Sequence, residues 1–158
     1  MNITVISVGK IKEKYFTAAI DEYSKRLSRF AKLNIIEVAD EKIPDNASEK
    51  EMEQIKEKEG NKILAKLPQN SFVVTLCIEG KEYSSEELAK KIADISMTSS
   101  HITFIIGGSL GLSDTVKSKS ALRLSFGKMT LPHQLMRVVL LEQIYREFKI
   151  NNNESYHK

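Results

Sequence analysis

The chain has 158 residues, of which 41% are hydrophobic and 28% charged, and its formal net charge at pH 7 is +3. This composition is typical of one globular domain with a buried core, and it excludes a disordered or fibrous protein. No stretch approaches the roughly 20 apolar residues that span a bilayer, and the N-terminus lacks the order of a signal peptide. We therefore expect a cytoplasmic protein without membrane contact.

The N-terminal third of the sequence predicts a strand, a helix and a second strand. Residues 3–8 are rich in β-branched residues and stop at Gly9. Residues 15–30 carry apolar side chains at steps of three and four, which places them on one stripe of a helix. Residues 33–38 form the second predicted strand.

The middle of the chain repeats this alternation with two capping signatures. Ser48 and Glu51 predict the start of a helix that runs to Leu67, and residues 72–78 predict a third strand. Ser84 and Glu87 repeat the signature before the next helix.

The C-terminal part adds two strands and a long helix. Residues 102–106 and 122–126 are the predicted strands, with a short polar segment at 113–119 between them. Pro132 suits the first turn of the last helix, where its missing N–H costs nothing. Apolar residues lie on more than one side of that helix, so we expect a homodimer interface along it.

Strands that alternate with helices indicate an α/β fold. We expect a mostly parallel sheet of five or six strands with helices on both faces, in a single domain that covers residues 1–158. In such a sheet ligands bind outside the carboxyl ends of the strands. Three of these ends, at residues 76–80, 107–111 and 126–131, form the predicted pocket.

The glycine turn at 107–111 leaves two interpretations open. Glycine lets backbone N–H groups approach a ligand closely, but Gly-Gly-x-x-Gly is not the dinucleotide fingerprint, and no Gly-Lys pair of the chain completes a P-loop. The turn is either a ligand loop or a tight structural bend. No Gly-x-Ser-x-Gly elbow is present, which disfavours an α/β-hydrolase.

Few residues suggest metal or thiol chemistry. Cys77 is the single cysteine and lies in an apolar run, where a buried thiol is expected. His101, His133 and His157 are too scattered to predict a zinc site, so we expect no metal.

Two histidine contexts have both a functional and a structural interpretation. His133 follows Pro132 at a helix N-terminus, where the dipole favours the neutral ring, and Arg137 lies one turn later on the same face. The pair could contact one ligand, or it could make a cap and a salt bridge. The tail at 151–158 either frays or folds back over a pocket, where Tyr156 and Lys158 would suit RNA.

Charge is distributed unevenly along the chain. Residues 10–32 contain seven basic and three acidic residues, and residues 117–158 contain eight basic and three acidic ones. Residues 37–59 reverse the balance, with nine acidic and four basic residues. The basic ends form either a face for a polyanion such as RNA or ordinary solvated helix surfaces.

Several of these motifs in combination resemble the bacterial ribosomal RNA large subunit methyltransferase H family. They are the stretch 104–112, the segment 124–134 with its Thr-Leu-Pro-His core, Arg137, Tyr145-Arg146, and the closing Tyr156-His157-Lys158. The start of the chain is similar as well, so the resemblance covers its whole length. It implies a SPOUT-type α/β fold with a C-terminal trefoil knot at about residues 72–150, working as a homodimer.

The resemblance also implies a cofactor and a reaction. S-adenosylmethionine would lie in the knot, held largely by backbone groups of Leu76, Gly107, Gly108, Phe126, Gly127, Lys128, Met129, Thr130 and Leu131. The implied reaction methylates N3 of a pseudouridine in 23S ribosomal RNA on the assembled ribosome. His133 and Arg137 would shape the pocket, while Tyr156, His157 and Lys158 would reach the base, from the other protomer.

Two other functions remain open at this stage. A non-catalytic RNA- or nucleotide-binding module would use the same glycine turn, and it differs from the enzyme in lacking tight S-adenosylmethionine binding. A SPOUT methyltransferase for another RNA would bind the cofactor but transfer the methyl group elsewhere, because a fold does not determine its substrate.

Overall fold

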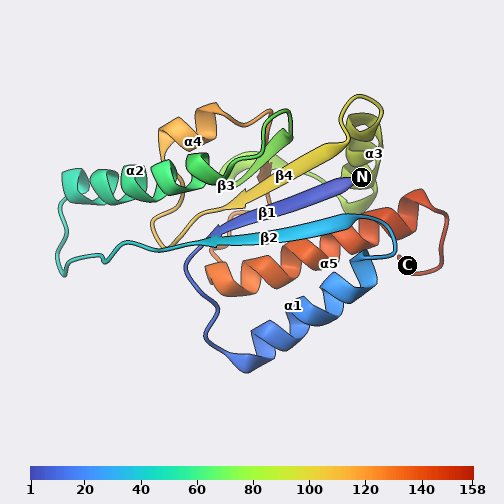
Figure 1. Ribbon diagram of the computed structural model, residues 1–158, viewed down its shortest axis with the longest axis horizontal. Coiled ribbons are helices and arrows are strands. Elements are labelled where there is room, and N and C mark those ends of the chain that lie inside the picture. The colour runs from blue at the N-terminus through green and yellow to red at the C-terminus, as the bar shows by residue number, and fades with distance from the viewer.

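The computed structural model describes residues 1–158, in which five strands alternate with five helices (Figure 1). Every predicted element is present. In chain order they are β1 (Asn2–Val8), α1 (Lys14–Leu27), β2 (Lys32–Val38), α2 (Glu49–Lys66), β3 (Phe72–Glu82), α3 (Ser85–Ser96), β4 (His101–Ile106), α4 (Asp114–Ser118), β5 (Leu122–Ser125) and α5 (His133–Asn151).

The strands form one sheet in the order β2-β1-β4-β3-β5, and every pair is parallel. The predicted α/β fold with a parallel sheet is confirmed, with five strands. β1 lies between β2 and β4, where Ile6 is in register with Ile36 on one side and Ile105 on the other. Because a parallel sheet is covered on both faces, such central strands are nearly continuously apolar.

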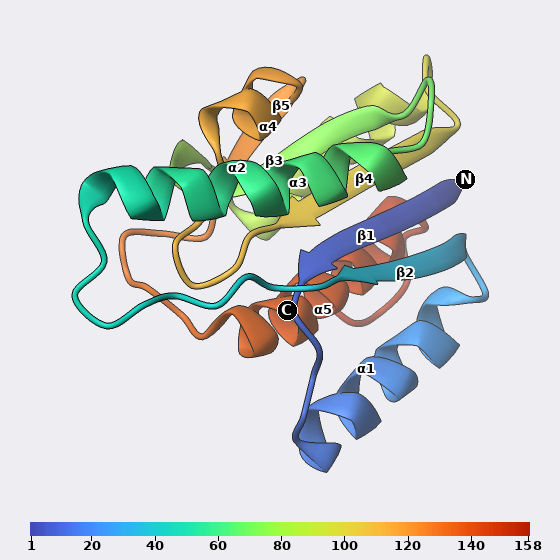
Figure 2. The same cartoon turned by 60° about the vertical axis from the view of Figure 1, so that its left-hand side comes forward.

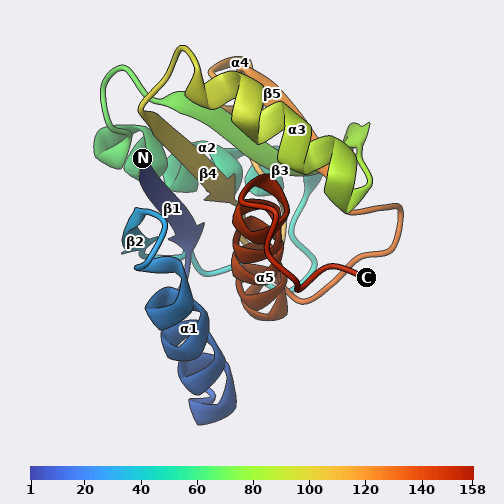
Figure 3. The ribbon, with the colours of Figure 1, turned by 90° about the vertical axis from the view of Figure 1, so that its right-hand side faces the viewer.

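The helices form a layer on each face of the sheet (Figures 1 and 2). α1, α3 and α5 share one apolar core with the sheet, which includes Leu27, Ile92 and Leu140. α2 and α4 cover the other face, where Ile63 and Val116 pack against the strands. Figure 3 shows α5 in the middle of its layer, with α1 and α3 on its two sides.

Both capping boxes are confirmed. The hydroxyl oxygen of Ser48 accepts the N–H of Glu51 and that of Ser84 accepts the N–H of Glu87, each at 3.1 Å. The carboxylate of each glutamate accepts a hydrogen bond from the backbone N–H of its capping serine. Pro132 differs slightly from its prediction, because it is the residue that precedes the first turn of α5.

β3 is longer than its predicted bounds at 72–78. A bulge between Leu76 and Lys81 shifts the register, after which Lys81 pairs with Leu124 of β5. The polar residues of this extension are tolerated because β5 is an edge strand.

The C-terminal tail is folded back rather than frayed (Figure 3). Glu154 pairs with Arg29, in the turn after α1, and with Lys149 of α5, the latter at 3.2 Å. Tyr156 stacks edge-on against Tyr145, with ring centroids 5.0 Å apart. The tail therefore docks on the helical layer of its own chain.

No helix of the structure has the length and apolar character that a membrane crossing requires. No group of three or more His, Cys, Asp or Glu side chains is arranged to hold a metal ion. The trefoil knot and the single-domain organisation stay predictions.

Candidate cofactor site

The carboxyl ends of β3, β4 and β5 surround a pocket of about 700 Å³. This is within the range of sites for small ligands and cofactors, roughly 300–1,000 Å³. Half of its 22 lining residues are hydrophobic. The predicted residues that line it are Leu76, Gly107, Gly108, Phe126, Gly127, Met129, Thr130, Leu131 and His133.

The glycine turn after β4 forms one wall of the pocket. A Cβ on Gly107 would lie 2.8 Å from the carbonyl carbon of Gly111, so a side chain would push the turn open. The N–H of Gly111 donates to the carbonyl oxygen of Gly108 at 3.0 Å, which closes the turn. The wall facing the pocket is therefore mainly backbone, which suits a ligand that needs close approach rather than a charged side chain.

The loop between β5 and α5 forms the opposite wall. The hydroxyl group of Ser125 donates to the carbonyl oxygen of Ile78 at 2.9 Å and accepts the N–H of Gly127 at 3.1 Å. These bonds tie the ends of β3 and β5 together. Gly127 has φ = 120°, a backbone conformation that favours glycine. Met129 and Leu131 are exposed at the rim, 86% and 39% respectively, so two apolar side chains remain free to contact a ligand.

His133 lies where the pocket meets the start of α5. Burial lowers the pKa of its imidazole below 6.5, and the charge of Arg137 lowers it further, while Asp40 opposes them. This shift favours the neutral ring, which can accept a hydrogen bond. Its cause is burial rather than the helix dipole on which the prediction rested. Burial makes the largest contribution, ahead of any neighbouring charge.

Arg137 lies one turn after His133 on α5 and does not line this pocket. It is 2% exposed, and its guanidinium donates to Glu37 Oε2 at 2.6 Å and to the carbonyl oxygens of Val8 and Gly9 at 2.9 and 2.7 Å. It joins the ends of β1 and β2 to α5. The structure thus gives Arg137 three partners within its own chain, and its part in catalysis stays a prediction.

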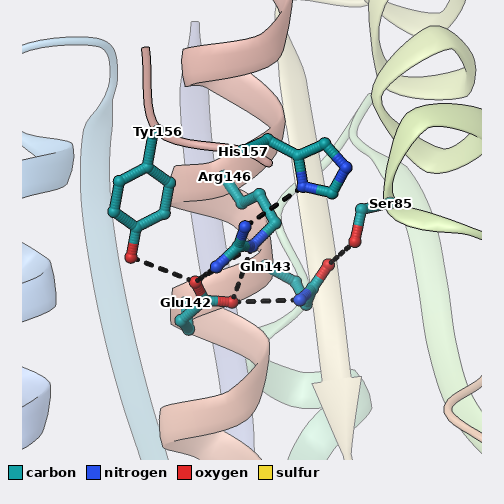
Figure 4. Close-up of polar contacts among 6 residues, drawn as sticks. All are labelled: Ser85, Glu142, Gln143, Arg146, Tyr156 and His157. Atoms are coloured by element: carbon teal, nitrogen blue, oxygen red, sulfur yellow. Dashed lines mark hydrogen bonds and ion pairs between the residues drawn. The ribbon is translucent and has the colours of Figure 1, made fainter.

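The tail residues also lie outside the pocket lining. Figure 4 shows His157 on the α3 side of α5 and Tyr156 on the other side of the helix. Tyr156 donates to Glu142 Oε1 at 3.2 Å. Arg146 donates to Nδ1 of His157 at 3.1 Å, which leaves the Nε2–H of His157 to donate to Glu86 Oε1 at 2.6 Å. One chain therefore does not bring its own Tyr156 and His157 to its own pocket.

Some lining residues were not predicted from the sequence. Lys56 of α2 and Lys117 of α4 reach the pocket, where they pair with Glu53 at 2.6 Å and Glu79 at 2.5 Å. Met136, one turn into α5, also contributes. No local pattern distinguishes these residues from the other lysines and apolar side chains of their helices.

Cys77 differs from its predicted burial. It is half-buried and lines the pocket, because it lies where β3 leaves the core. Lys128 is in the loop that forms the wall, and its exposed side chain is not part of the lining. The predicted contact of its backbone with the cofactor stays a prediction.

A parallel α/β sheet with a backbone-walled pocket at its carboxyl edge defines a protein that binds a small ligand or cofactor. A family model described as predicted SPOUT methyltransferase matches residues 1–157. Ribosomal RNA large subunit methyltransferase H of Clostridioides difficile is 60% identical over 159 residues, with 100% of both chains covered. The chain belongs to this family of SPOUT methyltransferases, as its motifs indicate.

Solved structures confirm the fold at low sequence identity. A methylase family protein from Haemophilus influenzae matches with a TM-score of 0.54 and 13% identity, over 99% of this chain and 70% of that one. A protein from Legionella pneumophila described as a putative methyltransferase, solved in complex with the bound cofactor SAM, matches with a TM-score of 0.50 and 13% identity. That match covers 92% of this chain and 66% of the other.

Proposed function

We propose that this protein uses S-adenosylmethionine to methylate N3 of a pseudouridine in 23S ribosomal RNA, on the assembled ribosome, in the cytoplasm. One observation carries the proposal: the three strand ends that the resemblance assigns to the cofactor meet in one pocket in this chain. Membership of the methyltransferase H family supports the choice of ribosomal RNA as substrate.

The pocket fits S-adenosylmethionine in both size and chemistry. Its volume of about 700 Å³ accommodates a nucleoside joined to an amino acid. Apolar side chains such as Leu76 and Leu131 can pack against the adenine, and the backbone of 107–111 and 126–131 offers hydrogen bonds to polar edges. No phosphate needs to be held, which agrees with the absence of a P-loop motif.

The protein contributes position rather than activation of the methyl group. When bound, S-adenosylmethionine supplies a methyl group on a sulfonium that is already a good leaving group. The residues of the pocket must align that methyl group with N3 at a near-attack distance of roughly 3 Å. N3 must lose its proton for its lone pair to attack, so hydrogen-bond donors near the base oxygens would lower the barrier.

Tyr156, His157 and Lys158 are proposed to contact the base from the partner protomer. His157 is bonded to Arg146, which lies 13 residues after His133 on α5. At a rise of 1.5 Å per residue this places the two positions roughly 20 Å apart along the helix. A tail docked in this way is too far from its own pocket, so a second copy is needed to complete the site.

The surface of α5 supports such a homodimer. Leu135, Val138 and Val139 are only half-buried on this helix, which is apolar on more than one side. Burial of a face of this kind against a second copy would remove apolar surface from water, which stabilises association.

Two measurements test the proposed function. Calorimetry should detect S-adenosylmethionine binding, which a plain RNA-binding module would lack. Transfer of tritium from labelled cofactor should then be compared among intact ribosomes, free 23S RNA and transfer RNA. We expect transfer to the ribosome; transfer to transfer RNA alone would assign the chain to another substrate, and no transfer to any RNA would refute a methyltransferase.

A further inference from the structure

A buried carboxylate packs against the glycine turn and is not among the residues that line the pocket. Glu59 of α2 is 5% exposed, while most charged residues of this helix are at the surface. Burial raises the pKa of Glu59 above 4.5, and the hydrogen bond from Glu41 partly reverses this. Because burying a carboxylate is costly unless it is bonded, its contacts require an explanation.

Glu59 fills the space between two segments that are far apart in sequence. Its Oε2 accepts the backbone N–H of Glu41, in the loop after β2, at 3.0 Å. Its Oε1 lies 3.3 Å from the position that a Cβ on Gly108 would take, so the carboxylate packs directly against the turn. Figure 2 shows both segments passing below α2.

The next residues of α2 fix the same two segments. A Cβ on Gly60 would lie 2.6 Å from the Oγ of Ser113, so the helix backbone sits against the end of the turn. Lys62 donates to the carbonyl oxygen of Ala39 at 3.1 Å and pairs with Glu41 at 3.2 Å. One face of α2 thus holds the turn after β4 and the loop after β2 together.

One segment lines the proposed site, and the other lies near His133 at its edge. The turn is the pocket wall, and the loop carries Asp40. A Cβ on Gly9 would lie 3.9 Å from both the Cγ of Asp40 and the Nε2 of His133, which brings the loop near the histidine. A shift of Glu59 would therefore disturb both the pocket wall and the loop near His133.

We propose that Glu59 is a positioning residue for cofactor binding: its carboxylate holds the loop after β2 through Glu41 and supports the glycine turn at Gly108. This inference rests on the proposed function, because it takes the pocket to bind S-adenosylmethionine. Glu59 contacts neither cofactor nor RNA. It acts through the backbone of the turn, whose N–H groups must stay in place when the ligand arrives.

Glu59→Met tests the role, because methionine keeps the length of the side chain but cannot accept the N–H of Glu41. We expect the dissociation constant for S-adenosylmethionine to rise about tenfold or more, while kcat at saturating cofactor changes less than about threefold. Glu59→Gln keeps an acceptor and should restore affinity to within about threefold of the unmodified chain. Equal losses in the Met and Gln variants would overturn the proposal, and so would wild-type affinity in Glu59→Met.

Glu57→Met is the matched control. Glu57 lies on the same helix, but its carboxylate accepts a hydrogen bond from Thr115 of α4 at 3.2 Å rather than supporting the turn. Its substitution should leave cofactor affinity unchanged. A loss equal to that of Glu59→Met would make the effect a general property of α2, against the proposal.

Hydrogen exchange in the ligand-free protein separates this inference from the proposed function. Amides of residues 107–111 should exchange faster in Glu59→Met than in the control, and unchanged exchange would contradict positioning. If the unmodified chain fails to bind S-adenosylmethionine, the proposed function fails, while exchange still decides whether Glu59 holds the turn.

A second pair of variants covers the case in which Glu59→Met does not fold. Gly108→Ala places a methyl group 3.2 Å from Val8 Cγ1 and 3.3 Å from Glu59 Oε1 and should weaken binding, whereas the shorter side chain of Glu59→Asp relieves the second of these contacts. The double variant should bind more tightly than Gly108→Ala alone. If the two substitutions reduced cofactor affinity additively, positions 59 and 108 would not be coupled, which would overturn the proposal.

Discussion

Glu147 is a buried acidic residue whose carboxyl group makes no hydrogen bond. Its side chain is fully buried on α5, and neither carboxylate oxygen has a hydrogen-bond partner. Burial raises the pKa of Glu147 well above 4.5, and the neighbouring charge of Glu142 raises it further, while Arg146 opposes them. A carboxyl group in this environment is held in its protonated form, which avoids an unpaired buried charge.

Glu147→Gln should make the stability of the fold less dependent on pH. Because the pKa of Glu147 is raised in the folded state, protonation of this carboxyl group favours the fold. Its contribution to stability is complete below about pH 4.5, the pKa in the unfolded chain, and is lost as pH rises through the folded pKa. Gln does not titrate, so the stability of the variant relative to the unmodified chain should increase over this window. Urea unfolding between pH 4 and pH 8 measures this; a constant difference would contradict it.

Arg137→Ala should destabilise the protein strongly. The change removes a buried guanidinium and leaves the carbonyl oxygens of Val8 and Gly9 without their donor. We expect the free energy of unfolding in urea to fall by about 3 kcal/mol. Arg123→Ala, on the exposed surface of β5, is the control and should stay within about 0.5 kcal/mol. A loss below about 1 kcal/mol for Arg137→Ala would show that the buried contacts contribute little.

At the scale of elements, the fold could be predicted because local signals and tertiary packing agree. The two serine capping boxes and the apolar strands specify the alternation of helices and strands. The extension of β3 could not be predicted, because it depends on pairing with β5, which is distant in sequence. The docking of the tail likewise depends on Arg29, in the turn after α1, and on the aromatic contact with Tyr145.

Part of the site could be predicted from the sequence because of the geometry of a parallel sheet. In a parallel sheet all strands end at one edge, so three strand ends predicted one pocket. Lys56 reaches the pocket from α2, which covers the other face of the sheet from α5. No spacing of residues along the chain indicates this. His133 and Arg137 share a helix face by their spacing, but one turn along α5 separates the pocket rim from the buried ends of β1 and β2.

Removal of residues 156–158 should separate catalysis from cofactor binding. These residues do not line the pocket of their own chain, so the affinity for S-adenosylmethionine should change less than about threefold. Methyl transfer to ribosomes should fall at least about tenfold, because the groups proposed to contact the base are lost. His157→Ala should have the same effect. Undiminished turnover in both variants would exclude the tail from the mechanism.

At the scale of the whole molecule, the account requires two copies. Val139→Glu places a charge on the half-buried apolar face of α5 and should convert the proposed dimer into monomers, as measured by light scattering at micromolar concentration. The monomer should bind cofactor but transfer little methyl group, because no partner tail reaches its pocket.

Lys50→Glu, a charge reversal on the exposed surface of α2, is the control for this change and should remain dimeric and active. A monomeric unmodified chain would contradict the composite site, and so would a fully active Val139→Glu monomer.

The position of the transferred methyl group tests the central claim most directly. Ribosomes that lack the modification are incubated with the protein and labelled S-adenosylmethionine, and the 23S RNA is then digested to nucleosides and analysed by mass spectrometry. The account predicts that the label appears in a pseudouridine methylated at N3, with no more than one methyl group per ribosome. Label in any other nucleoside, or none in 23S RNA, would contradict it.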